Sequence, residues 1–585
     1  MESIESTESI ESINDGAKVV NMELNQIIRK WALKNAHDYG KADMGSVVGK
    51  VIAEMPDAKK DMKSAMKDIK SIVDEVNGMT KPEIKKALNE FEFQEKPKDE
   101  EHHIRLPPHP DGNVVTRFAP EPSGYAHIGH AKAALLSWGA AKEANGRFIL
   151  RMDDSNPVLA KQEFVDSWRE ILKWLGIDWE SESFTSDNMD ILYEYAFELI
   201  KRGKAYVCEC HADVIKQNRE AKKACGCRDK FEVQNTKDFE KMITGGFKEG
   251  KAILRYKGDM RALNSVMRDP TLARIIETEH FRQGDKYSTW PSYDFVTPIL
   301  DSTQGVTHAI RSKEYELRDE LYYAIIDDLE LRKPIMLSIS RLNVKNNTTQ
   351  KRVIRKLVQE NVIDGWDDPR LLTMIGMRRR GIQPAALREF ALSFGGIGKS
   401  ESKEATIEPL LHANRKLLDP VSKRMHFVKD PMVLIIKGLK SEVDLPFHSE
   451  EDLGSRKLVV DGKVLVNKSD VTEGEIIRLR DLCNVGIMEI VGNSANCEMI
   501  ETKKMPEKKI QWVPVESAAK VTILKPLDLM DGDVPRKDSM QIDSGFCEAG
   551  CRDLKEGDIV QFLRYGFVRK EKSGENGELK FVFSC

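Results

Sequence analysis

The spacing of apolar residues changes several times along the chain, and each change predicts a different kind of structure. Between about Met22 and Phe93, apolar residues recur at helical spacing, as in ELNQIIRKWALKNA and KDMKSAMKDIKSIVDEVNGM. In TKPEIKKALNEF, Thr80 is placed as an N-cap, with Pro82 near the first helical position and Glu83 three residues after the cap. This part of the chain is predicted to be a small all-helical domain.

From Asn113 onward, strand and helix patterns alternate. NVVTRFA predicts a strand, HIGHAKAALLSWGAAKEAN a helix and RFILRMDD a second strand, which together indicate a β-α-β unit with parallel strands and a right-handed crossover. After an irregular stretch from YVCEC to GCRDK, KAILRYKG and ARIIETEHF predict further strands. STWPSYDFVTPILDSTQGVTHAIRS returns to the sheet pattern and YELRDELYYAIIDDL is helical. An insertion of roughly 85 residues, longer than an ordinary loop, is therefore expected to split the α/β core.

Both ends of the chain differ from this core. Beyond Pro420, short alternating runs such as PMVLIIKG, RKLVVDGKVLVN, AKVTIL and IVQFLRYGFVRK are separated by Gly, Asp and Asn, which predicts one or two β-barrels. At the start, MESIESTESIESIND repeats Glu, Ser and Ile without a basic residue and predicts a disordered tail. QEKPKDEEHHIRLPPHPDG, which is charged and rich in proline, predicts a linker.

Composition narrows the class of protein. A chain of 585 residues exceeds a single hydrophobic core, so several domains are expected. The net charge of -4 provides no general attraction for nucleic acid, so a polyanion would have to bind a local basic face. No apolar run reaches the roughly 18 residues that span a bilayer, which predicts no membrane partner. The acidic start does not resemble a secretory signal, and nine sparse cysteines do not resemble a secreted disulfide framework, so we expect a cytoplasmic setting.

Candidate chemistry is concentrated in RFAPEPSGYAHIGHAKAAL, residues 117–135. His127 and His130 lie one turn apart at the predicted helix start, where free N–H groups and the positive end of the helix dipole attract phosphate. Both imidazoles are placed to donate hydrogen bonds to phosphate oxygens whose charge grows in a transition state. Gly129 removes a side chain where a flat base could stack on the backbone. The alternative is two ordinary histidines at a helix start.

Four ordered motifs over about 270 residues resemble the class I aminoacyl-tRNA synthetases, in the branch for glutamate and glutamine. HIGH at 127–130 is the class signature. RMDDSNP at 151–157 resembles RFDDTNP of this branch, and YDFVTPILDSTQGVTHAIRSKEY at 293–315 resembles its substrate-pocket segment. DGWDDPRLLTMIGMRRRGI at 364–382 is similar to the GWDDPR…RRRG stretch. More weakly, the two ends resemble the helical N-terminal domain of the archaeal and eukaryotic type and the two anticodon-binding barrels.

The resemblance implies a multidomain α/β protein with a Rossmann-type class I synthetase catalytic core, an insertion, a helical N-terminal domain and C-terminal all-β barrels. The expected boundaries are a disordered tail 1–20, a helical N-terminal domain 21–96, a linker 97–112, a first catalytic half 113–204, an acceptor-stem insertion with a cysteine knuckle 205–289, a second catalytic half 290–345, a KMSKS-like loop with a helical connective domain 346–418, and anticodon-binding β-barrels 419–585.

The second class signature departs from the pattern of the branch. SRLNVKNNTTQKRVI aligns without gaps with SRLN…LSKRKL, and the Leu-Ser-Lys-Arg-Lys positions become Thr349, Gln350, Lys351, Arg352 and Val353. The central lysine, on a mobile loop, can neutralise charge that develops on departing pyrophosphate, with help from the following arginine. The lost serine and final lysine predict a weaker loop. A non-catalytic, tRNA-binding scaffold therefore stays as an alternative.

The resemblance also implies where the substrates bind. Arg117 and Tyr293 would line the amino-acid site, and Asp153 would hold the substrate ammonium by charge pairing. The catalytic residues would be His127, His130 and Lys351. The tRNA contacts would include Asp367 and Arg370. The ATP site would comprise Glu121, Ser123, His127, Gly129, His130, Lys132, Ser312, Arg341, Leu342, Thr349, Gln350, Lys351 and Arg352.

One residue separates glutamate from glutamine as the substrate. In THAIRSKEY, Arg311 takes the position of the cysteine in THSLCTLEF of glutaminyl-tRNA synthetases. A guanidinium can hold a γ-carboxylate bidentately, whereas a neutral amide would leave its buried charge uncompensated, at a cost of roughly 2–5 kcal/mol. We therefore expect glutamate, with glutaminyl-tRNA synthetase as the runner-up. A salt bridge of Arg311 on the surface is the alternative without a substrate role.

Four cysteines form two close pairs, Cys208 with Cys210 and Cys225 with Cys227. Four thiols in two pairs suit a closed, tetrahedral, structural Zn²⁺ site, although the spacing is CxC rather than CxxC. His211 is a spare candidate ligand. Four reduced thiols in a tight knuckle are the alternative.

The expected function is that of a glutamate–tRNA ligase. The enzyme would activate L-glutamate with ATP, a substrate with Mg²⁺, to glutamyl-adenylate, and would transfer it to the 3′ end of tRNA-Glu. Positioning and charge stabilisation would carry the rate without a covalent nucleophile. In this branch tRNA is usually bound before the amino acid is activated. Whether tRNA-Gln is also charged stays open, and the protein is expected to be a monomer.

Overall fold

The computed structural model describes residues 24–37, 40–55, 58, 61–91, 106–394, 396–397, 403–502, 505–574 and 576–585. It divides into two compact units, Met1–Glu101 and His102–Cys585, and each is described by itself. The predicted tail 1–20 and residues 97–105 of the predicted linker lie outside the described residues. Within the described ranges, no helix has the length and apolar character that crossing a bilayer requires.

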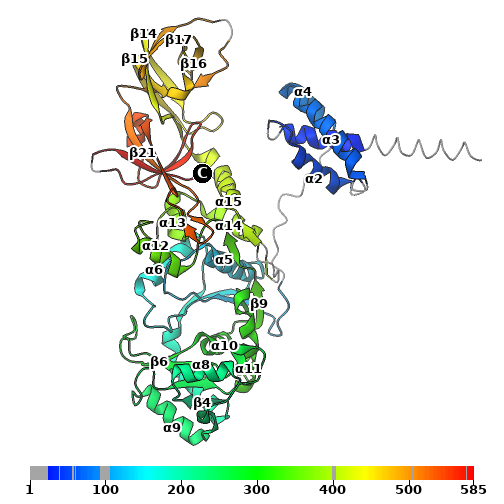
Figure 1. The fold of residues 1–585 in the computed structure, drawn as a ribbon, viewed down its shortest axis with the longest axis vertical. Coiled ribbons are helices and arrows are strands. Elements are labelled where there is room, and N and C mark those ends of the chain that lie inside the picture. The colour runs from blue at the N-terminus through cyan, green and yellow to red at the C-terminus, as the bar shows by residue number, and fades with distance from the viewer. Residues whose placement is uncertain are drawn as a thin grey trace, which may run out of the picture. The chain divides into compact units, whose positions relative to one another are not determined.

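The first unit is helical, as its apolar spacing predicts (Figure 1). Its helices share one core that includes Ile28, Ile69 and Val73. At the last helix, the backbone N–H of Thr80 donates a 2.7 Å hydrogen bond to Glu83, which confirms the predicted capping box. The helices are residues 24–37, α2 (Met44–Glu54), α3 (Met62–Asn77) and α4 (Lys81–Leu88).

A five-stranded parallel sheet forms the centre of the second unit, in the order β3-β2-β1-β8-β9. The predicted β-α-β unit is confirmed as β1, α5 and β2. Because the strand order reverses between β1 and β8, a crevice for ligands is expected at the carboxyl ends of these two strands. The strands are β1 (Val115–Phe118), β2 (Arg147–Met152), β3 (Ser181–Phe184), β8 (His308–Ser312) and β9 (Ile335–Ile339). The helices between them are α5 (Ile128–Glu143), α6 (Gln162–Trp174), α7 (Met189–Lys201), α10 (Tyr293–Thr303) and α11 (Asp319–Leu329).

Helix α10 differs from the sequence prediction, which gives this segment a sheet pattern. The helix contains Pro298, which normally breaks helices, and the β-branched residues Val296 and Ile299, which favour strands. Tertiary burial outweighs these local preferences, since Val296 and Ile299 are almost fully buried in a core shared with α11.

A separate antiparallel sheet, β4-β5-β6-β7, lies between the two halves of the parallel sheet in the chain, where the sequence predicts an insertion. In Figure 1 it lies at the opposite end of the second unit from the C-terminal sheets. Its strands are β4 (Ala205–Cys208), β5 (Ile253–Tyr256), β6 (Thr271–Ile275) and β7 (Thr289–Pro291), accompanied by α8 (Ala212–Glu220) and α9 (Glu232–Ile243).

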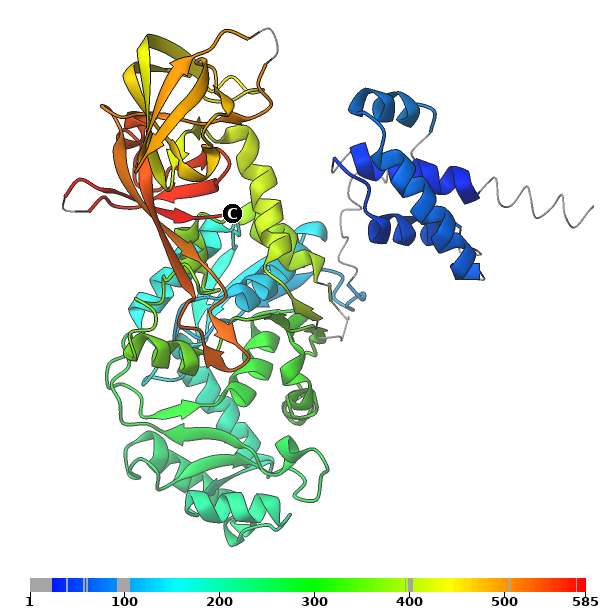
Figure 2. The same ribbon diagram turned by 45° about the horizontal axis from the view of Figure 1, so that its top comes forward.

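The C-terminal part holds two seven-stranded, barrel-like sheets, as the alternating runs predict (Figure 2). The first sheet is inserted in the chain between β13 and β21 of the second. The first sheet contains β14 (Pro431–Pro446), β15 (Ser455–Asn467), β16 (Ile476–Leu479), β17 (Asn484–Val491), β18 (Ser494–Met499), β19 (Lys509–Ile510) and β20 (Val513–Pro514). The second contains β12 (Arg424–Met425), β13 (Phe427–Val428), β21 (Ala519–Pro526), β24 (Met540–Cys547), β25 (Ile559–Phe562), β26 (Gly566–Lys570) and β27 (Leu579–Phe583).

A hairpin from the second sheet reaches the segment that carries the altered class signature. The backbone N–H of Met530 donates to the carbonyl of Asn346 at 3.0 Å, and Asn346 Nδ2 donates to Asp528 Oδ2 at 2.8 Å. Met530 also packs in one apolar cluster with Ile354 and Leu357. The hairpin strands are β22 (Met530–Asp531) and β23 (Val534–Pro535); the neighbouring elements are β10 (Leu342–Val344), β11 (Lys403–Ala405), α12 (Lys351–Gln359), α13 (Met374–Arg380), α14 (Pro384–Ser393) and α15 (Glu408–Leu418).

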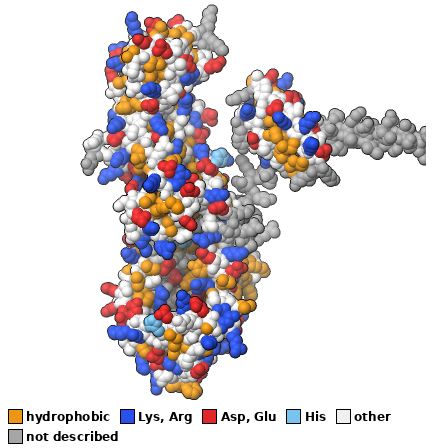
Figure 3. Space-filling model, viewed as in Figure 1, with side chains coloured by type: hydrophobic (Ala, Val, Ile, Leu, Met, Phe, Trp, Pro, Cys, Tyr) orange, Lys and Arg blue, Asp and Glu red, His pale blue; other side chains and the backbone are white. Residues whose placement is uncertain are grey.

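Charged side chains of both signs are interspersed over the face shown in Figure 3. This agrees with the small net charge, and it directs the search for anion-binding sites to local clusters.

Candidate active site

Both predicted histidines lie at the start of α5, which follows β1 in the chain. His127 is the N-cap, and its Nδ1 accepts a 3.1 Å hydrogen bond from the backbone N–H of Gly129. Nδ1 of His130 accepts a 3.3 Å hydrogen bond from the backbone N–H of His127, and the two rings stack with centroids 3.6 Å apart. A neutral imidazole that accepts at Nδ1 carries its proton on Nε2. Each ring therefore keeps one N–H donor for a ligand.

The surroundings keep both rings neutral. Burial, together with the positive charges of Lys351 and Arg341, lowers the pKa of His127 to about 4. Burial, the neighbouring ring and Lys351 lower the pKa of His130 well below its usual value. At neutral pH the helix start therefore presents two uncharged donors rather than two cations. Gly129 leaves little room for a side chain, because a Cβ there would lie 3.1 Å from His127 Cε1.

Lys351, the first residue of α12, lies against the loop that precedes the histidines. Its Nζ donates a 2.7 Å hydrogen bond to Ser123 Oγ, which in turn donates to Glu121 Oε2 at 2.6 Å. Burial lowers the pKa of Lys351, while Glu121 acts in the opposite direction. A Cβ on Gly124 would lie 3.2 Å from Lys351 Cε, so this glycine lets the lysine stem lie close to the loop. The altered signature thus still brings its lysine to the helix start.

The other residues expected at the ATP site are more scattered. Arg341 is exposed and lies 3.9 Å from Glu314, while Leu342 is buried in β10. Ser312 ends β8 and is half-buried, and Gln350 is the exposed N-cap of α12. Thr349 is half-buried and Arg352 exposed, so Arg352 faces solvent beside Lys351.

Lys132, which was expected at the ATP site, is instead hydrogen-bonded to groups inside the fold. Its ammonium is buried and donates to Ser340 O at 2.9 Å, Ser340 Oγ at 2.9 Å and Phe394 O at 3.2 Å. Burial lowers the pKa of Lys132 to about 8. The side chain fixes the backbone just before Arg341 from inside the fold.

Arg117 is buried in a charge cluster that sequence reasoning missed. Its Nε and Nη2 donate to the two carboxylate oxygens of Asp301, each at 3.0 Å, and Nη1 donates to Ile310 O at 2.9 Å. Arg151 Nη2 donates to the same carboxylate at 2.6 Å, and Tyr322 Oη donates to it at 3.1 Å. Burial alone would raise the pKa of Asp301, but the two guanidinium groups lower it overall. Asp301, the acid that directly follows the apolar residues Pro298–Leu300 in α10, was the available signal.

Asp153 and Tyr293 lie at the same end of the parallel sheet. Asp153 Oδ1 accepts from Ser155 Oγ at 2.9 Å and from Thr185 Oγ1 at 3.3 Å. Burial raises its pKa, with the charge of Arg151 acting against that rise. Tyr293 begins α10, its ring centroid lies 5.0 Å from that of Tyr315, and it interacts electrostatically with Arg117.

Arg311 ends in the interior rather than on the surface. It lies near the carboxyl end of β8, and its side chain is 6% exposed. Nη2 forms an ion pair with Asp319 Oδ1, and the guanidinium lies 5.7 Å from the ring centroid of Tyr322. The structure thus places three arginines, Arg117, Arg151 and Arg311, around Tyr322.

The two residues expected to contact tRNA have different exposures. Arg370 donates to both carboxylate oxygens of Asp368 at 2.9 and 2.7 Å and to Ser539 Oγ at 3.0 Å, with its side chain 9% exposed. Asp367 is exposed and lies 3.4 Å from Arg379 Nη1. Arg370 thus links the segment before α13 to the second barrel-like sheet.

The four cysteines meet as their spacing predicts. Their sulfur atoms all lie within 4.8 Å of one another. Cys208 and Cys225 are 3.8 Å apart at Sγ, as are Cys210 and Cys227. A tetrahedral zinc with Zn–S bonds of about 2.3 Å requires S–S separations of about 3.8 Å, so the thiols fit this ion. His211 is exposed and pairs with Asp213 instead.

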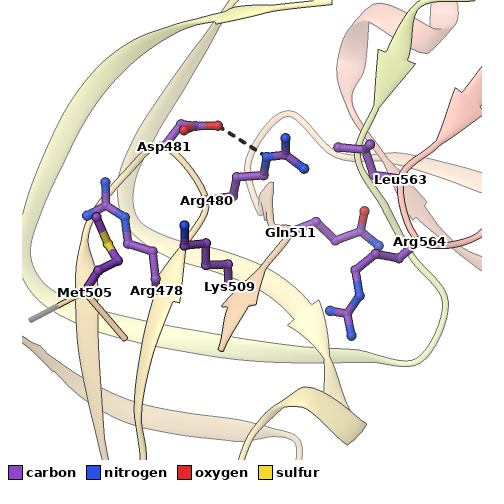
Figure 4. A pocket seen from close by; sticks show the side chains of 8 residues that line it. All are labelled: Arg478, Arg480, Asp481, Met505, Lys509, Gln511, Leu563 and Arg564. Carbon is purple, nitrogen blue, oxygen red and sulfur yellow. Dashed lines mark ion pairs between the residues drawn. The ribbon is translucent and has the colours of Figure 1, made fainter. Parts of the chain in front are cut away.

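A basic pocket that the sequence did not reveal lies between the two barrel-like sheets. The cavity has a volume of about 380 Å³, and Figure 4 shows the cationic side chains around it. Gln511 Nε2 donates to Phe427 O at 2.5 Å, while its buried Oε1 has no hydrogen-bond partner among the described residues. Only Asp481 contributes an acid to the lining. The lining residues are Arg478, Arg480, Asp481, Met505, Lys509, Gln511, Leu563 and Arg564.

Comparisons with known proteins agree with the geometry. Residues 113–420 match the family model described as tRNA synthetases class I (E and Q), catalytic domain. Residues 422–504 and 509–571 match two models described as tRNA synthetases class I (E and Q), anti-codon binding domain.

Curated relatives match over almost the whole chain. The chain is 42% identical to a glutamate–tRNA ligase of Nitrosopumilus maritimus, over 94% of this chain and 98% of that protein. It is 39% identical to a glutamate–tRNA ligase of Cenarchaeum symbiosum, over 93% and 97% of the two chains. It is 37% identical to one of Pyrococcus furiosus, over 96% and 100%.

Proposed function

The chain belongs to the class I tRNA synthetases for glutamate and glutamine and acts as a glutamate–tRNA ligase, and we propose how its residues divide the reaction. In the first step, the α-carboxylate of glutamate attacks the α-phosphate of ATP, and glutamyl-adenylate forms as pyrophosphate leaves. In the second step, a ribose hydroxyl at the 3′ end of tRNA attacks the activated carbonyl, and AMP leaves. Mg²⁺ enters with ATP and neutralises part of the phosphate charge.

The paired histidines carry the proposal for the first step. Both have Nδ1 occupied by a backbone N–H, so both have an Nε2–H to donate. Donors that are neutral and already fixed need no reorganisation as negative charge develops on the phosphate oxygens. The N-terminus of α5 adds its dipole in the same place. His127 and His130 thus stabilise the transition state of adenylate formation.

Lys351 is assigned to the departing pyrophosphate. Its hydrogen bond to Ser123 holds the ammonium beside the histidine pair before ATP binds. An ammonium near departing phosphates offsets their growing charge. Gln350 and Val353 stand where the family pattern has a serine and a second lysine. The exposed Arg352 is therefore the remaining cation of this motif beside Lys351.

Arg311 is assigned to the γ-carboxylate of glutamate, with Asp153 opposite the ammonium of the amino acid. A buried guanidinium favours a carboxylate over a neutral amide, and this supports glutamate over glutamine. Tyr293 forms part of the wall. Arg117 is given a positioning role, because its donors are occupied by Asp301 and by the carbonyl of Ile310.

The basic pocket between the barrel-like sheets is assigned to the anticodon end of tRNA. Four cations line it with a single acid, which suits the phosphate backbone, and the free Oε1 of Gln511 offers an acceptor to a base edge. The hairpin around Met530 gives these sheets a direct contact with the segment before Lys351. Occupation of the pocket by tRNA can therefore influence the activation step through packed atoms.

The four thiols are assigned to one structural Zn²⁺. Two of their S–S separations, at 3.8 Å, match a closed tetrahedral site, and all four sulfur atoms lie within 4.8 Å of one another. The metal would tie the end of β4 to the turn at Cys225–Cys227 and so hold the insertion in shape. Arg255 Nη1, 3.8 Å from Cys208 Sγ and 3.9 Å from Cys225 Sγ, would offset part of the thiolate charge.

A cytoplasmic monomer completes the proposal. All nine cysteines are free, which suits a reducing compartment. The candidate catalytic residues, the cysteine cluster and the barrel-like sheets all come from one chain, so no second copy is needed to complete a site.

Aminoacylation of purified tRNA-Glu and tRNA-Gln with labelled glutamate tests this function. Labelled tRNA-Glu is the expected product, and the tRNA-Gln arm decides whether the enzyme also charges that tRNA. Charging with glutamine instead would favour glutaminyl-tRNA synthetase. No charging and no ATP–pyrophosphate exchange at any enzyme concentration would favour a tRNA-binding scaffold.

A further inference from the structure

The guanidinium of Arg311 already has a carboxylate partner in this chain. Asp319 is the first residue of α11, and its Oδ1 forms an ion pair with Arg311 Nη2. The arginine side chain is 6% exposed and that of the aspartate 31%. A substrate carboxylate would therefore meet an arginine whose charge is already compensated by a carboxylate of the chain.

The other arginines of the pocket are held more firmly. Arg117 and Arg151 share the fully buried carboxylate of Asp301, through two and one hydrogen bonds respectively. Asp319 pairs with Arg311 through Oδ1, which is itself buried, while the aspartate side chain as a whole is partly open to solvent. Because the side chain of Asp319 is partly exposed whereas that of Asp301 is fully buried, Asp319 is the easier of the two carboxylates to exchange for another one.

The position of Asp319 on its helix supports exchange. At the start of α11 the helix dipole favours a carboxylate whether or not the arginine is present, and the backbone N–H of Asp319 itself donates to Glu316 O. The preceding turn is held from the insertion by Asn264, whose Nδ2 donates to Leu317 O at 2.7 Å and to Glu320 Oε2 at 2.9 Å. The backbone that carries Asp319 is thus anchored, while its carboxylate has a second favourable environment.

We infer that Asp319 is a built-in competitor of glutamate for Arg311. This inference rests on the proposed assignment of Arg311 to the γ-carboxylate. In the empty pocket Asp319 compensates the buried guanidinium; when glutamate binds, its γ-carboxylate takes the place of Asp319 or shares the arginine against the repulsion of that second carboxylate. In both cases Asp319 weakens glutamate binding, and it acts as a positioning residue that sets affinity rather than as a catalytic residue.

Such a competitor has a use in this reaction. A site that binds free glutamate very tightly gains nothing in rate once the amino acid is saturating, because uniform binding lowers KM without raising kcat. Asp319 keeps Arg311 oriented in the empty site and lowers the affinity for the ground state.

Glutamate binding measured by calorimetry on the full chain tests the inference. Asp319→Asn keeps the shape and an acceptor oxygen but removes the charge, so the Kd for glutamate should fall about three- to tenfold. Asp319→Glu keeps the competing carboxylate and should stay within about twofold of the unmodified protein. Glu316→Gln removes an exposed carboxylate three residues away and serves as the matched charge control, with an expected change of less than about twofold.

An Arg311→Cys background separates the two assignments. In this background, adding Asp319→Asn should no longer tighten glutamate binding, because the guanidinium for which the two carboxylates compete is absent. The rise in Tm caused by saturating glutamate gives a second readout and should be larger for Asp319→Asn than for the unmodified protein.

If Asp319→Asn binds glutamate no more tightly than the unmodified protein while Arg311→Cys still weakens glutamate binding, the proposed role of Asp319 is wrong and the assignment of Arg311 stands. Equal tightening by Glu316→Gln would also overturn it, because the effect would then be one of general charge. If Arg311→Cys leaves glutamate binding intact, the assignment of Arg311 itself fails, and the competitor fails with it.

Discussion

The ammonium of Lys351 donates a 2.7 Å hydrogen bond to the hydroxyl of Ser123, which lies 228 positions earlier in the chain. This contact joins the altered second signature to the loop before the first signature. It shows that the loss of the family serine and final lysine has not removed the central lysine from the candidate site.

Lys351→Ala should therefore slow glutamate activation by about tenfold or more while changing the KM for glutamate little. The physical reason is that the lysine meets the pyrophosphate rather than the amino acid. ATP–pyrophosphate exchange at varied glutamate, with saturating tRNA, measures both quantities. Arg352→Ala, which removes the exposed neighbouring charge, is the matched control and should have the smaller effect. An increase in the KM for glutamate without a loss of rate would contradict the assignment.

His127→Ala and His130→Ala should each slow adenylate formation about 10²- to 10³-fold, corresponding to roughly 2.7–4 kcal/mol for one lost donor to a developing charge. Binding of tRNA should change little, because neither ring belongs to the basic pocket. Single-turnover activation and a filter-binding assay measure the two effects. His412→Ala, on an exposed position of α15, is the control. If both His127→Ala and His130→Ala activate glutamate at the normal rate, the two histidines do not stabilise the transition state of adenylate formation.

The pH profile of activation should show no acid limb near pH 6.5, where an ordinary histidine titrates. Burial lowers the pKa of His127 to about 4, so this ring stays a neutral donor down to about pH 5, and burial also lowers the pKa of His130 well below its usual value. An acid limb near pH 6.5 that disappears in His127→Asn would contradict this.

The lowered pKa values of His127 and His130 also make the free energy of unfolding depend on pH. Since the folded-state pKa lies below the unfolded value, the free energy of unfolding contains a contribution that is complete above about pH 6.5 and is lost as the pH falls toward 4. Urea unfolding of the unmodified protein and of His127→Asn at pH 7 and pH 5 measures it. The unmodified protein should lose more stability between these values than the variant.

Protein purified without chelator should contain about one zinc per chain, and Cys225→Ser should lower both the metal content and the Tm. Elemental analysis and thermal unfolding give independent readouts. Cys483→Ser, a half-buried cysteine outside the cluster, should change neither. Metal-free protein with full activity and an unchanged Tm would reduce the four cysteines to a knuckle of reduced thiols.

The elements around the first histidines were predictable because local and tertiary preferences agree there. HIGHAKAALLSWGAAKEAN predicts a helix and RFILRMDD a strand, and α5 and β2 form in these segments. Helix α10 could not be predicted in the same way, since Pro298 disfavours a helix and its β-branched neighbours favour a strand, whereas burial against α11 favours the helix.

Those residues of the candidate site that belong to recognisable sequence motifs could be predicted. The short sequence distance between His127 and His130 brings their rings together, and the two CxC pairs bring four thiols together. Asp301 carries no such mark, because Arg117 and Arg151 lie on strands distant in the chain. Asp319 lies only eight residues after Arg311, but no motif marks the pair. The same limit applies to Lys132 and Arg370, whose charges the fold directs to internal partners.

Recognition of glutamate by Arg311 is tested most directly by the ratio of kcat/KM for glutamate to that for glutamine, measured for the unmodified enzyme and for Arg311→Cys with the same saturating tRNA. Losing one partner of a desolvated charge pair costs roughly 2–5 kcal/mol, so kcat/KM for glutamate should fall by tens to thousands of times. Glutamine carries no γ-charge, so its value should fall less or rise, and the ratio should collapse. An equal fall for both amino acids would contradict the account, because Arg311 would then support only the shape of the pocket.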